Sequence, residues 1–131
     1  MACLALKKIM KKILIADQDQ KLLRRLDDLL VKNWLVVEKV QNATSLYPVV
    51  NVFCPDLIIM EINLGYLDGR SFCNDMKSMA ETAHIPIILL TTMSHREISA
   101  IFCEADAILG KPLNETILIQ TISDLVIGSR Q

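Results

Sequence analysis

Short apolar runs alternate along the chain with stretches in which apolar residues recur at helical spacing. The apolar runs predict five strands, which are Lys12 to Ala16, Leu35 to Val40, Leu57 to Glu61, Ile85 to Leu90 and Ala107 to Leu109. The inner runs are apolar almost without interruption, which is typical of parallel strands that are covered by helices on both faces. This alternation predicts an α/β domain built around a parallel sheet.

The stretches between the strands predict five amphipathic helices. In the first, leucines recur every three or four residues and charged side chains occupy the opposite face. The five predicted helices are Lys21 to Lys32, Thr44 to Val52, Ser71 to Met79, His95 to Cys103 and Glu115 to Ile127. The second should end before Pro55, because proline cannot continue a helix, and Asn114 should cap the fifth. The inward residues expected in the last two are Ile98, Ile101, Phe102, Ile117, Leu118, Ile122 and Leu125.

The composition fits one domain that needs neither metals nor disulfides to hold its core. Hydrophobic residues make up 52% of the 131 residues, and the net charge is −1. Without a basic field, neither nucleic acid nor a membrane is an expected partner. Residues 1–9 are expected to be an N-terminal extension. Their apolar stretch is too short for a signal peptide, and the lysines come after this stretch, whereas in a signal peptide they come before it. The domain is therefore predicted at residues 10–131.

The four cysteines indicate free thiols. Cys3, Cys54, Cys73 and Cys103 are widely spaced and form no C-x-x-C pair, so neither a zinc site nor a redox dithiol is supported. Reduced and partly buried thiols of this kind are typical of a cytoplasmic protein, which is the expected location.

Polar side chains follow four of the predicted strands. Asp17, Gln18 and Asp19 follow the first strand, Glu61 ends the third, Thr91 and Thr92 follow the fourth, and Lys111 follows the fifth. The carboxyl ends of parallel strands share one edge of a sheet, where open α/β folds bind their ligands. Carboxylates, a hydroxyl and an ammonium group there would suit Mg²⁺ and a phosphoryl group. The alternative is an ion pair from Lys111 that only closes this edge.

Four segments together resemble the motifs of the CheY-like response-regulator receiver domain. They are Lys12 to Asp19, Pro55 to Gly69, Ile85 to Thr92 and Ala105 to Pro112, and they occur in the order and close to the spacing of that family. The resemblance covers Lys11 to about Ile127. It implies a flavodoxin-like (βα)₅ three-layer sandwich with strand order 2-1-3-4-5, and a role in two-component signalling. In active members, an aspartate takes a phosphoryl group from a partner kinase's phosphohistidine with the help of Mg²⁺.

The resemblance also assigns roles to single residues. Asp17 matches the first residue of the acidic pair, Glu61 the phosphoacceptor, Asn63 the residue that lends a backbone carbonyl to the metal, Thr91 the switch hydroxyl and Lys111 the lysine that contacts phosphate. A weak Mg²⁺ site is therefore expected at Asp17, Glu61 and Asn63. The bond between Lys111 and Pro112 matches one that is usually cis in the family.

The departures from the family pattern fall on its chemistry. Gln18 replaces the second acid and Glu61 replaces the acceptor aspartate, while Ile108 stands where an aromatic switch residue is common. Gly65 replaces the usual proline, Thr92 replaces a small alanine, and the segment from Thr91 to Lys111 is about two residues short. These changes predict a pseudo-receiver, with no enzymatic activity and no required cofactor, which acts by binding a protein.

Several alternatives remain open from the sequence. Glu61 paired with Lys111 could mimic the phosphorylated state, or the rim could be inert. A working Mg²⁺-dependent receiver would accept phosphate at Glu61 or at a neighbour such as Asp19. A flavin or nucleotide site is disfavoured, because Gly65, Gly69, Gly110 and Gly128 form no phosphate-binding loop.

The expected partner is a protein. The resemblance points to a histidine kinase, an output domain or a second copy of this chain. It places the contact on the face formed by the predicted fourth helix, fifth strand and fifth helix, which includes Ala100 and Ile108. His95 and Arg96 are expected to be a solvated helix start.

Overall fold

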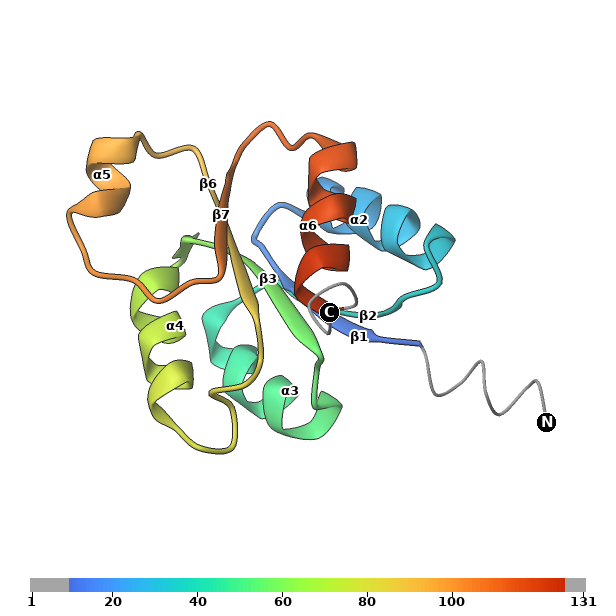
Figure 1. Ribbon diagram of the computed structural model, residues 1–131, viewed down its shortest axis with the longest axis horizontal. Helices are drawn as coiled ribbons and strands as arrows, with labels where there is room; N and C mark the ends of the chain where they lie inside the picture. Colours follow the sequence, from blue (N-terminus) through green and yellow to red (C-terminus); the bar gives the residue numbers. More distant parts are fainter. Residues whose placement is uncertain (1–9, 127–131) are drawn as a thin grey trace.

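Five strands form a single parallel sheet in a computed structural model, which describes residues 10–126. The sheet has the order β2-β1-β3-β6-β7, so the predicted fold and strand order are confirmed (Figure 1). The strands are β1 (Lys12–Ala16), β2 (Val36–Val40), β3 (Leu57–Glu61), β6 (Ile87–Thr91) and β7 (Ala107–Gly110). Their limits differ from the predicted ones by no more than two residues.

Helices cover both faces of the sheet. The helices α2 (Gln20–Lys32) and α6 (Glu115–Val126) lie on one face, and α3 (Leu46–Phe53) and α4 (Gly69–Ser78) lie on the other (Figure 1). Alternate residues of each strand feed the two cores, as for Ile58 on one side and Ile59 on the other. The result is the three-layer sandwich that the sequence predicts.

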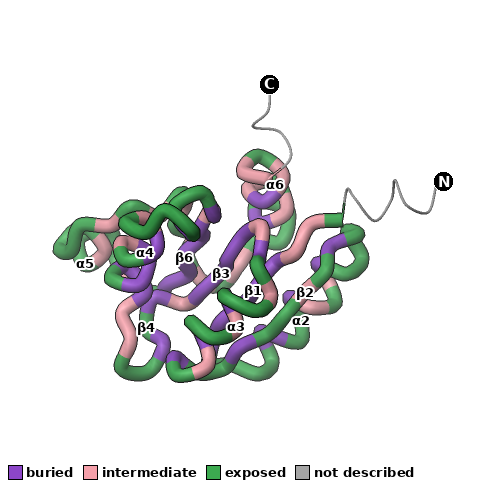
Figure 2. The backbone as a smooth tube through the Cα atoms, turned by 90° about the horizontal axis from the view of Figure 1, so that it is seen from below, coloured by how far each residue is buried: buried purple, intermediate pink, exposed green. Residues whose placement is uncertain are grey.

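The central strands are more deeply buried than the edge strands. Every residue of β6 and the first four residues of β3 are buried (Figure 2). In contrast, β2 has one buried residue, Val40, and every residue of β7 is exposed or half-buried. This difference explains why the central runs are continuously apolar in the sequence and why β2 contains Glu38 and Lys39.

Side-chain caps fix the start of several helices. Asp19 accepts hydrogen bonds from the backbone N–H groups of Lys21 and Leu22, and α2 therefore begins at Gln20. Asp68 caps α4 in the same way. Asn114 accepts a hydrogen bond of 3.0 Å from the N–H of Ile117, so its predicted role as a cap is confirmed. A short 3₁₀ helix, η1 (Ala43–Ser45), precedes α3, which ends before Pro55 as predicted.

The predicted fourth helix is wrong in length. The helix α5 spans only His95–Ser99, although the prediction extended it to Cys103. Ile101 and Phe102 were expected to face inward, yet they are 45% and 73% exposed. The chain leaves the helix because side chains of α4 bind its backbone carbonyls, as described below.

One side chain of the last helix is also misplaced by the prediction. Ile117 was expected to face inward, but it is 52% exposed, whereas Leu118 and Ile122 are buried as expected. Ile117 lies in the first turn, where its N–H is bound by the Asn114 cap and its side chain points away from the sheet. The predicted extension at residues 1–9 and the end of this helix at Ile127 lie outside the described residues.

A small hairpin after β3 was not predicted. The strands β4 (Asn63–Leu64) and β5 (Leu67–Asp68) pair antiparallel across a two-residue loop of Gly65 and Tyr66. Gly65 has a φ of +65°, which a glycine adopts without steric cost at the first position of a tight hairpin loop. Proline cannot reach this angle, because its ring fixes φ near −65°. Gly65 therefore allows a backbone conformation of the loop that proline at this position could not adopt.

Candidate functional site

Three charged side chains meet at the carboxyl ends of the strands. The Lys111 Nζ atom lies 2.8 Å from Asp17 Oδ2 and 2.5 Å from Glu61 Oε1. The side chains of Asp17, Glu61 and Lys111 are only 5%, 13% and 19% exposed. The structure thus brings together the three residues that the sequence placed at this rim, and it joins them in one ion cluster.

The sheet fixes the backbone of all three residues. Asp17 directly follows β1 and donates its N–H to Val40 O at 3.1 Å, while Glu61 ends β3 opposite Leu90. Lys111 directly follows β7 and donates its N–H to Thr91 O at 2.8 Å. Because these positions belong to the ladder of the sheet, the three side chains start from a rigid base.

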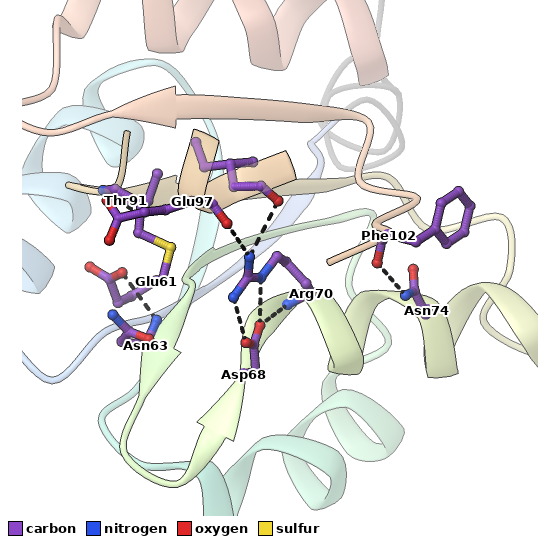
Figure 3. Close-up of polar contacts among 10 residues, drawn as sticks. Glu61, Asn63, Asp68, Arg70, Asn74, Thr91, Glu97 and Phe102 are labelled. Carbon is purple, nitrogen blue, oxygen red and sulfur yellow. Dashed lines mark hydrogen bonds and ion pairs between the residues drawn. The ribbon is translucent and has the colours of Figure 1, made fainter. Parts of the chain in front are cut away.

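The outer oxygens of both carboxylates are bound to the backbone. Asp17 Oδ1 accepts a hydrogen bond of 2.9 Å from the N–H of Asp19. Glu61 Oε2 accepts one of 3.1 Å from the N–H of Asn63, as Figure 3 shows. All four carboxylate oxygens therefore have a donor. The sequence pointed to the carbonyl of Asn63 as a metal ligand, and it gave no sign that the N–H of this residue would hold Glu61.

The ammonium group of Lys111 is held in its charged form. Burial lowers its pKa, but the hydrogen bonds to Asp17 and Glu61 outweigh this effect and raise the pKa above its usual range. The contribution of this cluster to stability is complete below the pKa that a lysine has in the unfolded chain, and it is lost as the pH rises through the higher folded pKa. The cluster is thus intact across the whole physiological range of pH.

The remaining predicted residues lie around this cluster. Thr91 is the last residue of β6 and is only 2% exposed, and its hydroxyl oxygen accepts a hydrogen bond of 2.9 Å from the N–H of Met93 (Figure 3). Gln18 is exposed and reaches over the hairpin, since a β-carbon built on Gly65 would lie 3.4 Å from its Nε2 atom. Its amide is therefore turned toward the loop.

The donor set fits a divalent cation poorly. Between residues 10 and 126, no three His, Cys, Asp or Glu side chains are arranged to hold a metal ion. The two carboxylates at the rim each give one oxygen to Lys111, so a cation there would face the positive charge of the ammonium group. Mg²⁺ prefers several oxygen ligands in an octahedral arrangement, and the carboxylates of Asp17 and Glu61 already bind Lys111.

Comparison with known proteins identifies the family of this chain. The model of the response regulator receiver domain matches residues 13–123. The chain is 29% identical over 122 residues to the protein PilH of Pseudomonas aeruginosa, covering 91% of this chain and 100% of PilH. It is 24% identical to the chemotaxis protein CheY of Halobacterium salinarum, with 88% and 97% covered. It spans only 26% of the length of the response regulator PleD of Caulobacter vibrioides, to which it is 24% identical.

Solved structures show the same fold. The signal receiver domain of a signal transduction histidine kinase from Syntrophus aciditrophicus superposes with a TM-score of 0.84 at 27% identity, covering 92% of this chain and 93% of that domain. A two-component response regulator from Clostridium difficile gives a TM-score of 0.83 at 24% identity, with 93% and 100% covered.

The protein is thus a CheY-like module of the two-component signalling class. The chain belongs to the response regulator receiver domain family. The bond between Lys111 and Pro112 is cis, as the resemblance implied.

No helix within the described part of the chain has the length and apolar character needed to cross a membrane.

Proposed function

We propose that this domain is a pseudo-receiver, which signals by binding a protein without accepting a phosphoryl group and without enzymatic activity. The observation that carries the proposal is the closed ion cluster at the rim. Glu61 stands at the acceptor position with one oxygen on Lys111 and the other on the backbone of Asn63. A phosphoryl group attached to either oxygen would have to displace the donor that this oxygen already binds.

The geometry of Glu61 adds a second obstacle. Its side chain is one methylene longer than that of aspartate, and phosphoryl transfer depends on an in-line placement of the nucleophile. A misplacement of this order costs about 100-fold in rate. Gln18 also removes one negative charge from the region where a metal would assist the transfer, so we expect only weak Mg²⁺ binding at Asp17, Glu61 and Asn63.

The proposed contact surface is the face formed by α5, β7 and α6. Its elements and the segment after α5 expose apolar side chains, which are Ile101 at 45%, Phe102 at 73%, Ile108 at 36% and Ile117 at 52%. Single exposed apolar residues are common, but several on adjoining elements favour a protein partner. Because the chain belongs to the receiver family, we propose a histidine kinase, an output domain or a second copy of this chain as the partner.

Intact-mass spectrometry tests the proposal. The protein is incubated with acetyl phosphate and Mg²⁺, beside the variant Glu61→Gln and the double variant Glu61→Asp with Gln18→Asp. The wild-type mass should stay unchanged, while the double variant, which restores the aspartate and the acidic pair, serves as the positive control. A phosphoryl adduct on the wild type that is absent from Glu61→Gln would contradict the proposal.

That adduct would instead support the second candidate, a working receiver. The observation in favour of it is that Asp17 and Lys111, which the resemblance assigns to the family's chemistry, contact or adjoin Glu61 in the rim cluster, and that Thr91 is joined to Lys111 through the backbone. An adduct that persists in Glu61→Gln would point to a neighbouring acceptor such as Asp19.

A further inference from the structure

A stripe of polar side chains along α4 holds the chain that follows the start of α5. Arg70, Asn74 and Lys77 are spaced at one-turn intervals on α4, and each binds a different part of residues 97–106. We call these three residues the α4 stripe and residues 97–106 the 97–106 segment. The bonds of Arg70 and Asn74 explain why α5 ends early, since they occupy the carbonyls of Glu97, Ile98 and Phe102.

Arg70 makes the strongest of these contacts. It is 5% exposed, and its Nη1 atom donates to Glu97 O at 2.9 Å and to Ile98 O at 3.3 Å. Its Nε and Nη2 atoms donate to the two oxygens of Asp68 at 3.1 and 2.8 Å (Figure 3). This bidentate pair orients the guanidinium group toward the end of α5, where a cation is favoured.

Asn74 and Lys77 continue the contact along the segment. Asn74 donates its Nδ2 to Phe102 O at 2.8 Å and accepts at Oδ1 from the N–H of Glu104 at 2.9 Å (Figure 3). Lys77 Nζ lies 2.9 Å from Asp106 Oδ2, and that carboxylate also accepts from the N–H of Ile87. Most of these bonds end on backbone atoms, so they fix the path of the segment whatever side chains it carries.

The 97–106 segment connects the rim to the proposed contact surface. It begins in α5, just after the strand that ends in Thr91, and it leads into the strand that precedes Lys111. In a domain where the rim controlled the surface, this connection would have to move. A segment that is tied at three successive turns of a core helix has few ways to do so.

We propose that the α4 stripe is a latch that holds the 97–106 segment in one conformation, whatever the state of the rim. The role of this latch rests on the proposed function, since the latch keeps the proposed contact surface in one conformation that a partner can bind. Arg70, paired with Asp68, is the positioning residue at its centre, and Asn74 and Lys77 extend its reach.

A native thiol reports whether the latch is closed. Cys73 lies on α4 within the stripe and is 0% exposed, and Cys103 of the segment packs against the same core cluster. Burial of Cys73, with a further contribution from Cys103, raises the pKa of its thiol to about 12. A thiol that is buried and protonated reacts with iodoacetamide only after the segment opens. Cys54 is exposed and provides an internal reference.

The test is the rate of alkylation of Cys73 relative to Cys54, measured by peptide mass spectrometry on the full chain. Arg70→Met should raise this ratio about tenfold or more, the change expected for losing the charge-assisted bonds of Arg70. The milder variant Asn74→Ala should raise it less, and Arg24→Met, at an exposed arginine of α2, should leave it unchanged. Deuterium uptake should rise in residues 97–106 but not in β1 and β3, which excludes global unfolding as the cause.

Two results would overturn the latch. One is an unchanged Cys73 ratio in both Arg70→Met and Asn74→Ala. The other is a wild-type ratio that rises with acetyl phosphate and Mg²⁺, because the rim would then move the segment. A phosphoryl adduct at Glu61 with an unchanged Cys73 ratio would refute the proposed function alone and leave the latch in place.

Discussion

Replacing Lys111 with methionine tests the ion cluster at the rim directly. Methionine keeps much of the apolar length of the lysine stem and removes the charge. The substitution takes away the hydrogen bonds to Asp17 and Glu61 and leaves two carboxylates facing each other, with side chains 5% and 13% exposed. Both retain their backbone donors, so the loss is confined to the ammonium group.

The expected loss follows from these contacts. A hydrogen bond to a charged group contributes about 1.5–3 kcal/mol, and removing one partner of a buried ion pair costs about 3–5 kcal/mol. Because the lysine side chain is 19% exposed, we expect a value at the low end, about 3 kcal/mol of unfolding free energy at pH 7. Glu61→Gln should cost about 1 kcal/mol, since Lys111 keeps its bond to Asp17.

Urea unfolding followed by circular dichroism measures these values, and the double variant gives the coupling between the two residues. The coupling energy should be about 1–2 kcal/mol. Lys21→Met is the matched control, because Lys21 is exposed on α2 and should change stability by less than about 0.5 kcal/mol. If Lys111→Met is as mild as this control, or if the coupling is zero, the cluster does not hold the rim closed.

Two further predictions concern the hairpin and the latch. Arg70 lowers the pKa of Asp68 by its hydrogen bonds, so the contribution of this pair is complete above the unfolded pKa of about 3.9 and is lost as the pH falls through the lower folded value. Asp68→Asn, which can still cap α4, should cost about 1 kcal/mol at pH 7 after allowance for solvent screening. The difference from wild type should disappear as the pH falls through the lowered pKa of Asp68. A difference that urea unfolding shows to be constant as the pH falls would speak against the pair. Gly65→Pro, which restores the residue common in the family, should destabilise by about 2 kcal/mol or more because φ is +65°, and Gly65→Ala by about 1 kcal/mol. Thermal unfolding checks both, and a Gly65→Pro variant as stable as wild type would show that the loop takes another path.

The sheet and its two cores follow from local patterns in the sequence. Runs such as Leu57 to Met60 are apolar at every position because both faces of the strand are covered, and this signal does not depend on distant residues. The rim could also be predicted, since the topology of a parallel sheet brings Asp17, Glu61 and Lys111 to one edge. These parts of the fold can be predicted from the hydrophobic pattern and the order of the elements along the chain.

The failures arise where distant side chains decide the local structure. The segment after Ser99 has helical periodicity, but α4 binds carbonyls on both sides of this residue. Arg70 binds those of Glu97 and Ile98. Asn74 binds that of Phe102, which lies 28 positions later in the chain. Hydrophobic spacing cannot show such competition for backbone groups. An arginine two residues after an aspartate, at the predicted start of a helix, was the one available sign, and the sequence pattern gave Arg70 no role.

The hairpin after β3 was missed for a different reason. Its strands are two residues long, which is too short for a period, and only Gly65 signals the turn. Sequence spacing also could not show that the rim is closed, because this depends on a hydrogen bond from the N–H of Asn63 to the second oxygen of Glu61.

The central claim is that the conformation of the proposed contact surface does not change when the rim is exposed to a phosphodonor. Amide ¹H–¹⁵N spectra of the full chain, recorded with Mg²⁺ before and after addition of acetyl phosphate, test it most directly. The account predicts that the signals of residues 97–110 keep their positions, with small shifts at most near Asp17 and Glu61. Shifts that spread from Glu61 through Thr91 into α5 and β7 would contradict it.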